Sequence, residues 1–244
     1  MLFKDINCRC GIVPDADIYM SGMGDILEML RKNNISACAV SSNNAIRDDI
    51  RSGNTKLLAD CSAYDSVIPA ITLLPPVFRD EMYTEEELLG MIEQKKRIFF
   101  RMYPKSHRYH FTDWQLSWLA DVLEETRIPV LINIREADMD ELAVYKKAHP
   151  GTRIVLTNAT QWMNRMYVQL CRTFENIMVE TSNIIDYMGL EVLCREIGSE
   201  KILFGTNTPC KEPYDSIFML MYAGISNEEK EIIAYGNYDI LASG

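Results

Sequence analysis

The sequence predicts an α/β protein with a (β/α)8 TIM-type barrel, either regular or distorted, in one domain over residues 1–244. Its 244 residues are 48% hydrophobic, which is enough to bury one large core. Eight short apolar runs alternate with helical segments, as in parallel sheets whose strands are joined by helices. An open doubly wound sheet is the alternative, although no Gly-x-Gly-x-x-Gly or Gly-Lys-Ser/Thr loop is present to favour it.

The predicted strands are short apolar runs that end at Gly, Pro or Asn. They cover residues 3–9, 35–40, 67–74, 97–103, 129–134, 153–158 and 177–181, with the eighth beginning at 201 and closing at Gly205. Pro75 and Pro104 cannot continue a ladder and end the third and fourth strands. In the first strand, a period of two would place Asn7 and Arg9 with Asp5 on one face and Ile6 with Cys8 on the other.

The predicted helices fill the intervals between the strands. They cover residues 26–32, 43–61 with a break near Gly53, a segment opening at 84–87, and then 113–123, 139–147, 161–174, 185–197 and a capped helix from 226. A loop runs up to Asp25, which is the expected N-cap of the first helix. Leu88, Leu89 and Ile92 form the expected buried stripe of the helix after residue 84.

Charge and composition exclude several kinds of partner. The net charge of -10 and pI near 4.9, without a basic stripe, argue against nucleic acid. No apolar run approaches the ~20 residues that cross a bilayer, and the first residues lack a signal-peptide pattern, so we expect a soluble cytoplasmic protein without a membrane partner. Seven cysteines without a Cys-x-x-Cys pair indicate reduced, mostly buried thiols.

Several motifs resemble those of the amidohydrolase superfamily, in its amidohydrolase-related branch. The run Phe204-Gly205-Thr206-Asn207-Thr208-Pro209 is similar to the last-strand signature "FGSD-P" of that superfamily, with Asn207 in the place of the Asp. The branch carries His-x-His on its first strand and a His at the end of strands five and six. Here those places hold Asn7 and Arg9, Asn133, and Asn158.

The resemblance therefore implies a barrel that has lost its metal site. Catalytic zinc needs imidazole, thiolate or carboxylate donors, and a neutral amide or an Arg is a poor substitute. The chain has only His107, His110 and His149, and His149 precedes strand six, which places it on the opposite face. We expect no bound transition metal and no other cofactor.

A ring of amides and cations would stand at the strand ends instead. It comprises Asn7, Arg9, Arg101, Tyr103, Asn133, Arg135, Asn158 and Asn207. Such groups can bind a small anionic or polar molecule, with Arg gripping a carboxylate. The alternative is that the asparagines only satisfy one another, with Arg side chains paired to Asp5, Glu136 or Glu180.

Two classes of function follow. The first is a metal-independent hydrolase or lyase acting on a small carboxylate, ester or lactone. The superfamily contains a metal-independent lactonase group, from which this sequence departs because Asn207 stands in the place of its last-strand Asp. Glu180, at the end of strand seven, and His107 or His110, on the loop after strand four, are the candidates for proton transfer. The second is an inactive barrel that binds a small ligand or a protein partner. Composition leaves a homo-oligomer open.

Overall fold

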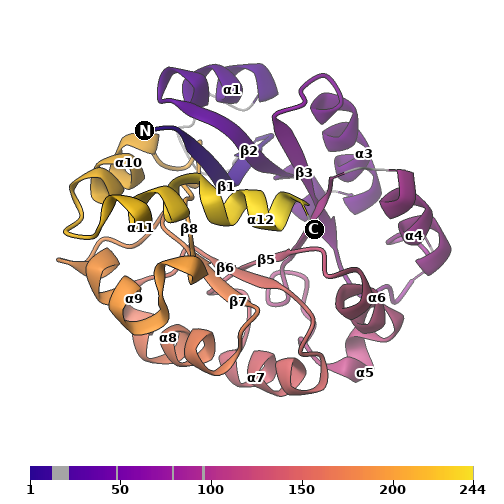
Figure 1. Cartoon of the computed structure of the whole chain (residues 1–244). Helices are drawn as coiled ribbons and strands as arrows, with labels where there is room; N and C mark the ends of the chain where they lie inside the picture. The colour runs from indigo at the N-terminus through magenta and orange to yellow at the C-terminus, as the bar shows by residue number, and fades with distance from the viewer. Residues whose placement is uncertain (13–21, 48, 79, 95–96, 244) are drawn as a thin grey trace.

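The computed structural model describes residues 1–12, 22–47, 49–78, 80–94 and 97–243. Eight parallel strands lie side by side in chain order: β1 (Phe3–Cys10), β2 (Ile35–Ser42), β3 (Val67–Leu73), β4 (Phe99–Met102), β5 (Val130–Asn133), β6 (Ile154–Thr157), β7 (Ile177–Glu180) and β8 (Ile202–Leu203). The backbone N–H of Ile6 donates to the carbonyl of Phe204 (3.0 Å), so the chain around β8 meets β1. The sheet therefore closes, which confirms the barrel and excludes the open alternative (Figure 1).

Helices surround the barrel (Figure 1). They are α1 (Met23–Lys32), α2 (Asn44–Arg47), α3 (Ile50–Cys61), α4 (Glu85–Gln94), α5 (Asp113–Leu116), α6 (Trp118–Thr126), α7 (Met139–Ala148), α8 (Asn164–Thr173), α9 (Gly189–Ile197), α10 (Pro213–Tyr222), α11 (Asn227–Glu231) and α12 (Asn237–Ser243). Short 3-10 turns lie at Gln161–Met163 and Ser199–Lys201, and a π-helical turn at Ile232–Gly236 precedes α12. No helix in the described part of the chain is both long and apolar enough to cross a membrane.

Two predicted helices differ in detail from the observed ones. The segment 113–123 is broken at Ser117, whose φ of +53° interrupts the helix between α5 and α6. The break predicted near Gly53 is wrong, because α2 ends at Arg47 and Gly53 lies inside α3. Gly53 is needed there for packing, since a Cβ at this position would lie 2.5 Å from the backbone of Ala45.

Two smaller expectations are also wrong, and a third is untested. The first helix begins at Met23 with Gly22 as its N-cap, rather than after Asp25. Leu89 is exposed, so the buried stripe of α4 rests on Leu88 and the partly buried Ile92. Residues 13–21 of the loop predicted before the first helix lie outside the described part of the chain.

A bulge in β1 sets the position of Asn7. The pairing of β1 with β2 shifts register between Asp5 and Cys8. As a result Ile6 packs into the barrel interior while Cys8 packs between the strands and the outer helices, so the prediction that they share a face is wrong. The bulge leaves the Asn7 side chain free to bond across the barrel.

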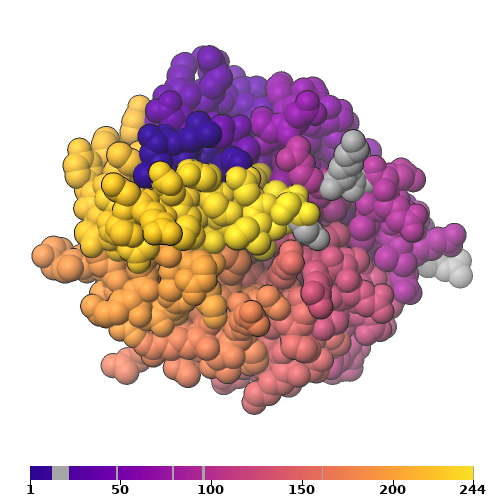
Figure 2. Space-filling view, viewed as in Figure 1, coloured from indigo at the N-terminus to yellow at the C-terminus, as the bar shows by residue number. Residues whose placement is uncertain are grey.

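The amino-terminal end of the barrel is closed by α12. Its Tyr238 meets Phe99 of the interior edge to face, with ring centroids 6.3 Å apart, and its Asp239 pairs with Lys4 at the start of β1 (2.5 Å). Figures 1 and 2 show α12 lying across this face of the barrel, close to the first residues of the chain. A site built on the strand ends must therefore lie at the other end, which is where barrels of this type keep their chemistry.

Candidate active site

Arg101 is the central side chain of the barrel mouth. It points inward from β4 and is fully buried. Its guanidinium donates to Asn7 Oδ1 (2.8 Å) and Thr157 Oγ1 (3.2 Å), which belong to β1 and β6. The side chain therefore crosses the barrel interior. Burial lowers the pKa of Arg101, and the neighbouring cation Arg9 acts in the same direction, while Tyr103 and Glu180 oppose the change.

Glu180 is held by four hydrogen bonds. Its Oε1 accepts from Asn7 Nδ2 (3.1 Å), Asn158 N (2.5 Å) and Ser182 Oγ (2.7 Å), and its Oε2 accepts from Ser182 N (2.5 Å). A Cβ at residue 205 would lie 2.4 Å from Oε2, so only Gly205 fits beside this carboxyl group. Burial raises the pKa of Glu180, and the hydrogen bonds from Asn158 and Ser182 oppose that rise.

The amides of β5 and β6 complete a hydrogen-bonded half of the mouth. Asn158 adopts a left-handed φ of +57°, which suits Asn better than most residues. Its Oδ1 lies 3.3 Å from Asn133 Nδ2 and 3.5 Å from Asn7 Nδ2. We call Asn133, Thr157, Asn158 and Glu180, which lie on or directly after β5, β6 and β7, the bonded arc. The alternative prediction, that the asparagines form hydrogen bonds to one another, applies to this half of the mouth.

The other half of the mouth carries buried polar atoms without a hydrogen-bond partner in the described part of the chain. They lie on or after β8, β1, β3 and β4, and we call this set the unpaired arc: Asn207 Oδ1, Arg9 Nε, Thr72 Oγ1, Arg101 Nε, Tyr103 Oη and His107 Nδ1. The guanidinium of Arg101 lies 5.6 Å from the Tyr103 ring centroid, which links two members. Buried polar groups are normally paired, and six of the twelve such atoms in the described residues belong to this one set, which indicates a site for a polar ligand.

The hydrogen bond of His107 leaves one ring nitrogen free to act as a base. Its Nε2 lies 3.1 Å from the carbonyl oxygen of Ile46, which can only accept. The proton of the neutral ring therefore sits on Nε2, and Nδ1 keeps its lone pair. The ring packs edge to face on Tyr103, with centroids 5.7 Å apart, so these two members of the unpaired arc are in contact.

Two of the predicted site residues lie outside this arrangement. Arg135 is exposed, and its backbone N–H donates to Asn133 Oδ1 (3.0 Å). Its side chain makes no hydrogen bond to the other described residues of the predicted ring of amides and cations. His110 is also exposed, and its Nδ1 bonds to Glu141 (2.5 Å) at the start of α7. The pairs considered between Arg and Asp5 or Glu136 are not formed in the described residues: Asp5 accepts from Thr206, and Glu136 accepts from Ser106.

Sequence reasoning missed three polar residues of the mouth. Thr72 and Thr157 occupy inward positions of β3 and β6, two residues beyond Ala70 and Val155 of the barrel interior, and Ser182 fixes Glu180. The period of two along each strand could have identified both threonines. Ser182 follows Glu180 after the strand has ended, so the period carries no signal for it.

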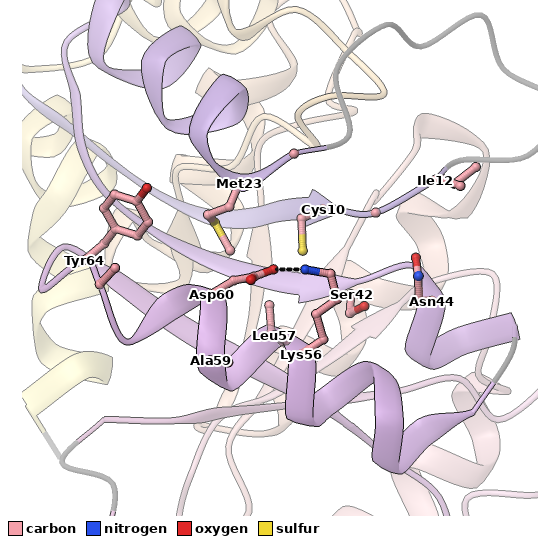
Figure 3. A pocket seen from close by; sticks show the side chains of 13 residues that line it. Cys10, Ile12, Met23, Ser42, Asn44, Lys56, Leu57, Ala59, Asp60 and Tyr64 are labelled. Carbon is pink, nitrogen blue, oxygen red and sulfur yellow. Dashed lines mark hydrogen bonds and ion pairs between the residues drawn. The ribbon is translucent and has the colours of Figure 1, made fainter.

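A separate cavity of about 660 Å³ lies at the ends of β1 and β2, between α1 and α3 (Figure 3). Cys10 faces Asp60, which pairs with Lys56 (2.8 Å) on the cavity wall. Burial raises the pKa of Cys10 to about 11, and Asp60 adds to the effect, so the thiol stays protonated at neutral pH. Six of the seven cysteines are buried, as predicted, and Cys210 is exposed.

Comparison with solved structures shows the same barrel in several proteins. A putative amidohydrolase from Staphylococcus aureus has a TM-score of 0.79 at 12% identity, with 100% of both chains covered. A dihydroxybenzoic acid decarboxylase from a Polaromonas species, solved with manganese and an inhibitor, has a TM-score of 0.79 at 14% identity, covering 98% of this chain and 96% of its own. A putative 2-pyrone-4,6-dicarboxylic acid hydrolase from Pseudomonas putida has a TM-score of 0.73 at 14% identity, covering 98% and 97%.

These likenesses confirm the predicted resemblance at the level of the fold. No family model and no curated protein matches the sequence. The residues at this mouth do not fit the metal found in the Polaromonas structure. No group of three His, Cys, Asp or Glu side chains in the described residues could hold an ion, and the Arg101 guanidinium crosses the centre of the mouth to Asn7 and Thr157.

Proposed function

We propose that this protein is a metal-independent hydrolase that acts on a small carboxylate-bearing ester or lactone at the barrel mouth. The unpaired arc carries the proposal. Arg9 and Arg101 supply positive charge and free donors for a carboxylate, and Tyr103 and Thr72 supply hydroxyl groups. The solved neighbours named for dihydroxybenzoic acid and for 2-pyrone-4,6-dicarboxylic acid support a carboxylate as the anionic group.

His107 is the residue that we assign to proton transfer. Its Nδ1 takes a proton from water as the water oxygen attacks the ester carbonyl carbon. The carbon–oxygen bond to the leaving group then breaks, and the same proton passes from Nδ1 to the departing alkoxide. The hydroxyl of Tyr103, beside the His107 ring, can donate to the carbonyl oxygen as negative charge develops on it.

Glu180 takes a positioning role in this proposal. Four hydrogen bonds from protein donors hold its two oxygens in place, which suits a side chain that orients its neighbours. It holds Asn7, which in turn accepts from Arg101. The orientation of the central guanidinium therefore depends on a carboxyl group that does not itself meet the substrate.

The second candidate is a barrel that binds a small anion without converting it. The bonded arc favours this candidate, because Asn133 and Asn158 bond to each other and leave that half of the mouth without a reactive group. Both candidates share the anion site. They differ in whether the ligand is recovered unchanged.

Turnover of a panel of carboxylate-bearing esters and lactones by chelator-treated protein separates the two. We expect the rate to be insensitive to chelator and to fall about 100-fold or more in His107→Gln, the usual size of a general-base contribution. His110→Gln is the matched control and should retain the wild-type rate, because His110 bonds to Glu141 outside the mouth.

Three results would oppose the hydrolase. A rate lost on chelation would contradict the metal-free mechanism, and equal losses in the two histidine variants would contradict the role of His107. A ligand that binds but is recovered unchanged would replace the hydrolase with the inactive binding barrel.

A further inference from the structure

Helix α10 is apolar on the face that it turns to solvent. Of its ten residues only Asp215 is charged. The helix buries Pro213, Ser216 and Leu220 against the barrel, yet Phe218 is 53% exposed and Tyr222 is 83% exposed. A helix that is apolar on most of its surface is normally covered on all sides, whereas no part of the described chain covers the outer face of α10.

The exposed aromatic side chains form a line along α10. Tyr214, Phe218 and Tyr222 are spaced four residues apart. The ring centroids of Tyr214 and Phe218 lie 6.0 Å apart, and those of Phe218 and Tyr222 lie 6.1 Å apart. Beside them, a groove of about 390 Å³ runs between α10 and the amino terminus, which Figure 1 shows as neighbours. Met1 lines this groove, and Met221 adds further exposed apolar surface.

We propose that this face binds the same face of a second copy of the chain, forming a dimer with twofold symmetry. The order Tyr, Phe, Tyr reads the same in both directions about Phe218. With two α10 helices antiparallel and Phe218 on the axis, Tyr214 of one copy meets Tyr222 of its partner, and the reverse contact forms as well. Self-complementarity of this kind is what a twofold interface requires.

The exposed area fits a dimer contact. The face comprises Met1, Tyr214, Phe218, Met221 and Tyr222, each at least 42% exposed. At about 200 Å² for each large side chain, it presents roughly 550 Å² of exposed surface. That lies at the upper end of the range for the largest patch on a typical monomer, about 300–600 Å², and is about two thirds of the roughly 800 Å² per partner of a standard interface.

Charge also favours a second copy at this face. Each chain carries a net charge of -10, so two copies repel over most of their surfaces. The groove beside α10 has no acidic residue in its lining, and its single charged side chain is that of Lys32. The carboxylates of Asp25, Glu28 and Glu212 line the neighbouring pocket that also contains Tyr214, so the groove itself adds no carboxylate to the contact.

Sedimentation analysis of the whole chain tests the dimer. We expect wild-type protein to sediment as a dimer at micromolar concentration. Phe218→Glu places two carboxylates at the axis and should weaken dimerisation by about 30-fold or more, the loss typical of a central aromatic anchor. Trp114→Glu is the control: Trp114 is exposed on α5, across the barrel from α10 (Figure 1), and its replacement should leave the dimer intact.

A crosslinking variant tests the dimer independently of whether Phe218→Glu folds. In a Cys210→Ser background, which removes the exposed native thiol, Phe218→Cys should form a disulfide between copies under mild oxidation. Val144→Cys, exposed on α7, should not. A monomeric wild type, a dimer unaffected by Phe218→Glu, or equal crosslinking of the two thiol variants would each overturn the proposal. A monomer would leave the face to a different kind of partner.

Discussion

At the scale of single residues, the mouth is organised by two opposite charges that do not touch. Arg101 and Glu180 are both fully buried, and Asn7 bridges them by accepting from the one and donating to the other. An isolated buried charge is costly, and hydrogen bonds reduce that cost. The arrangement therefore depends on the orientation of one amide, so replacing Asn7 would affect both charged groups.

The buried carboxyl of Glu180 gives the stability of the protein a defined pH dependence. Burial raises its pKa, so the folded state binds the proton more tightly than the unfolded state. The stability contributed by Glu180 is then complete below its unfolded pKa, about 4.3, and is lost as pH rises through the folded pKa. We expect the unfolding free energy of the wild type, minus that of Glu180→Gln, to fall with rising pH above about 4.

Urea unfolding at a series of pH values measures this difference. Glu87→Gln is a control of opposite sign, because hydrogen bonds and charge from Arg51 lower the pKa of Glu87 to about 2. The stability that Glu87 contributes should instead be lost as the pH falls. If the difference in unfolding free energy between the wild type and Glu180→Gln stays flat or rises with pH, burial does not dominate the pKa of Glu180.

The sequence identified most of the mouth because the resemblance placed residues at strand ends. Asn7, Arg101, Asn133, Asn158 and Glu180 are joined by hydrogen bonds in the structure. The division into bonded and unpaired arcs could not be predicted, because it depends on side-chain orientations across the barrel. Arg135 shows the limit: it follows strand five in sequence but faces solvent.

At the scale of elements, the strands were easier to predict than the breaks within the helices. Each strand is an apolar run with a polar end, and the sheet order follows from βα alternation. The capped helix predicted from residue 226 is observed, with a reciprocal capping box between Ser226 and Glu229. The break at Ser117 gave no signal, because a residue other than Gly adopts a backbone conformation that favours Gly.

Ser117 offers a test of this account of the break. Its φ of +53° with ψ of -133° is strained for a side chain with a Cβ, at a cost of about 1–3 kcal/mol. Ser117→Gly should therefore stabilise the protein by about 1 kcal/mol after the entropic cost of Gly, raising the Tm by about 2–4 °C. Calorimetry measures the change.

The matched substitution is Ser62→Gly, at the end of α3. Ser62 has an ordinary φ of -61°, and its hydroxyl donates to the carbonyl of Ala59 (2.7 Å), so replacing it should lower the Tm. A lower Tm for Ser117→Gly as well would mean that the break is not strained.

At the scale of the whole molecule, the two ends of the barrel differ in character. The amino-terminal end is filled by apolar side chains and covered by α12, with Tyr238 and Leu241 packed against the interior. The opposite end holds polar groups that bond to one another in the bonded arc and buried polar atoms without a partner in the unpaired arc. This difference between the two ends is the basis for assigning the function to the carboxyl ends of the strands.

The central claim is that the unpaired arc binds a small carboxylate without a metal, and isothermal titration of chelator-treated protein with carboxylates tests it most directly. We predict that the wild type binds at least one of them. Arg9→Met should weaken that binding by on the order of 2–5 kcal/mol, because a buried partner charge would lose its cation. Arg127→Met, at an exposed helix end on the opposite side of the barrel, should bind as the wild type does. Binding that appears only when a divalent metal is restored, or equal weakening in the two arginine variants, would contradict the account.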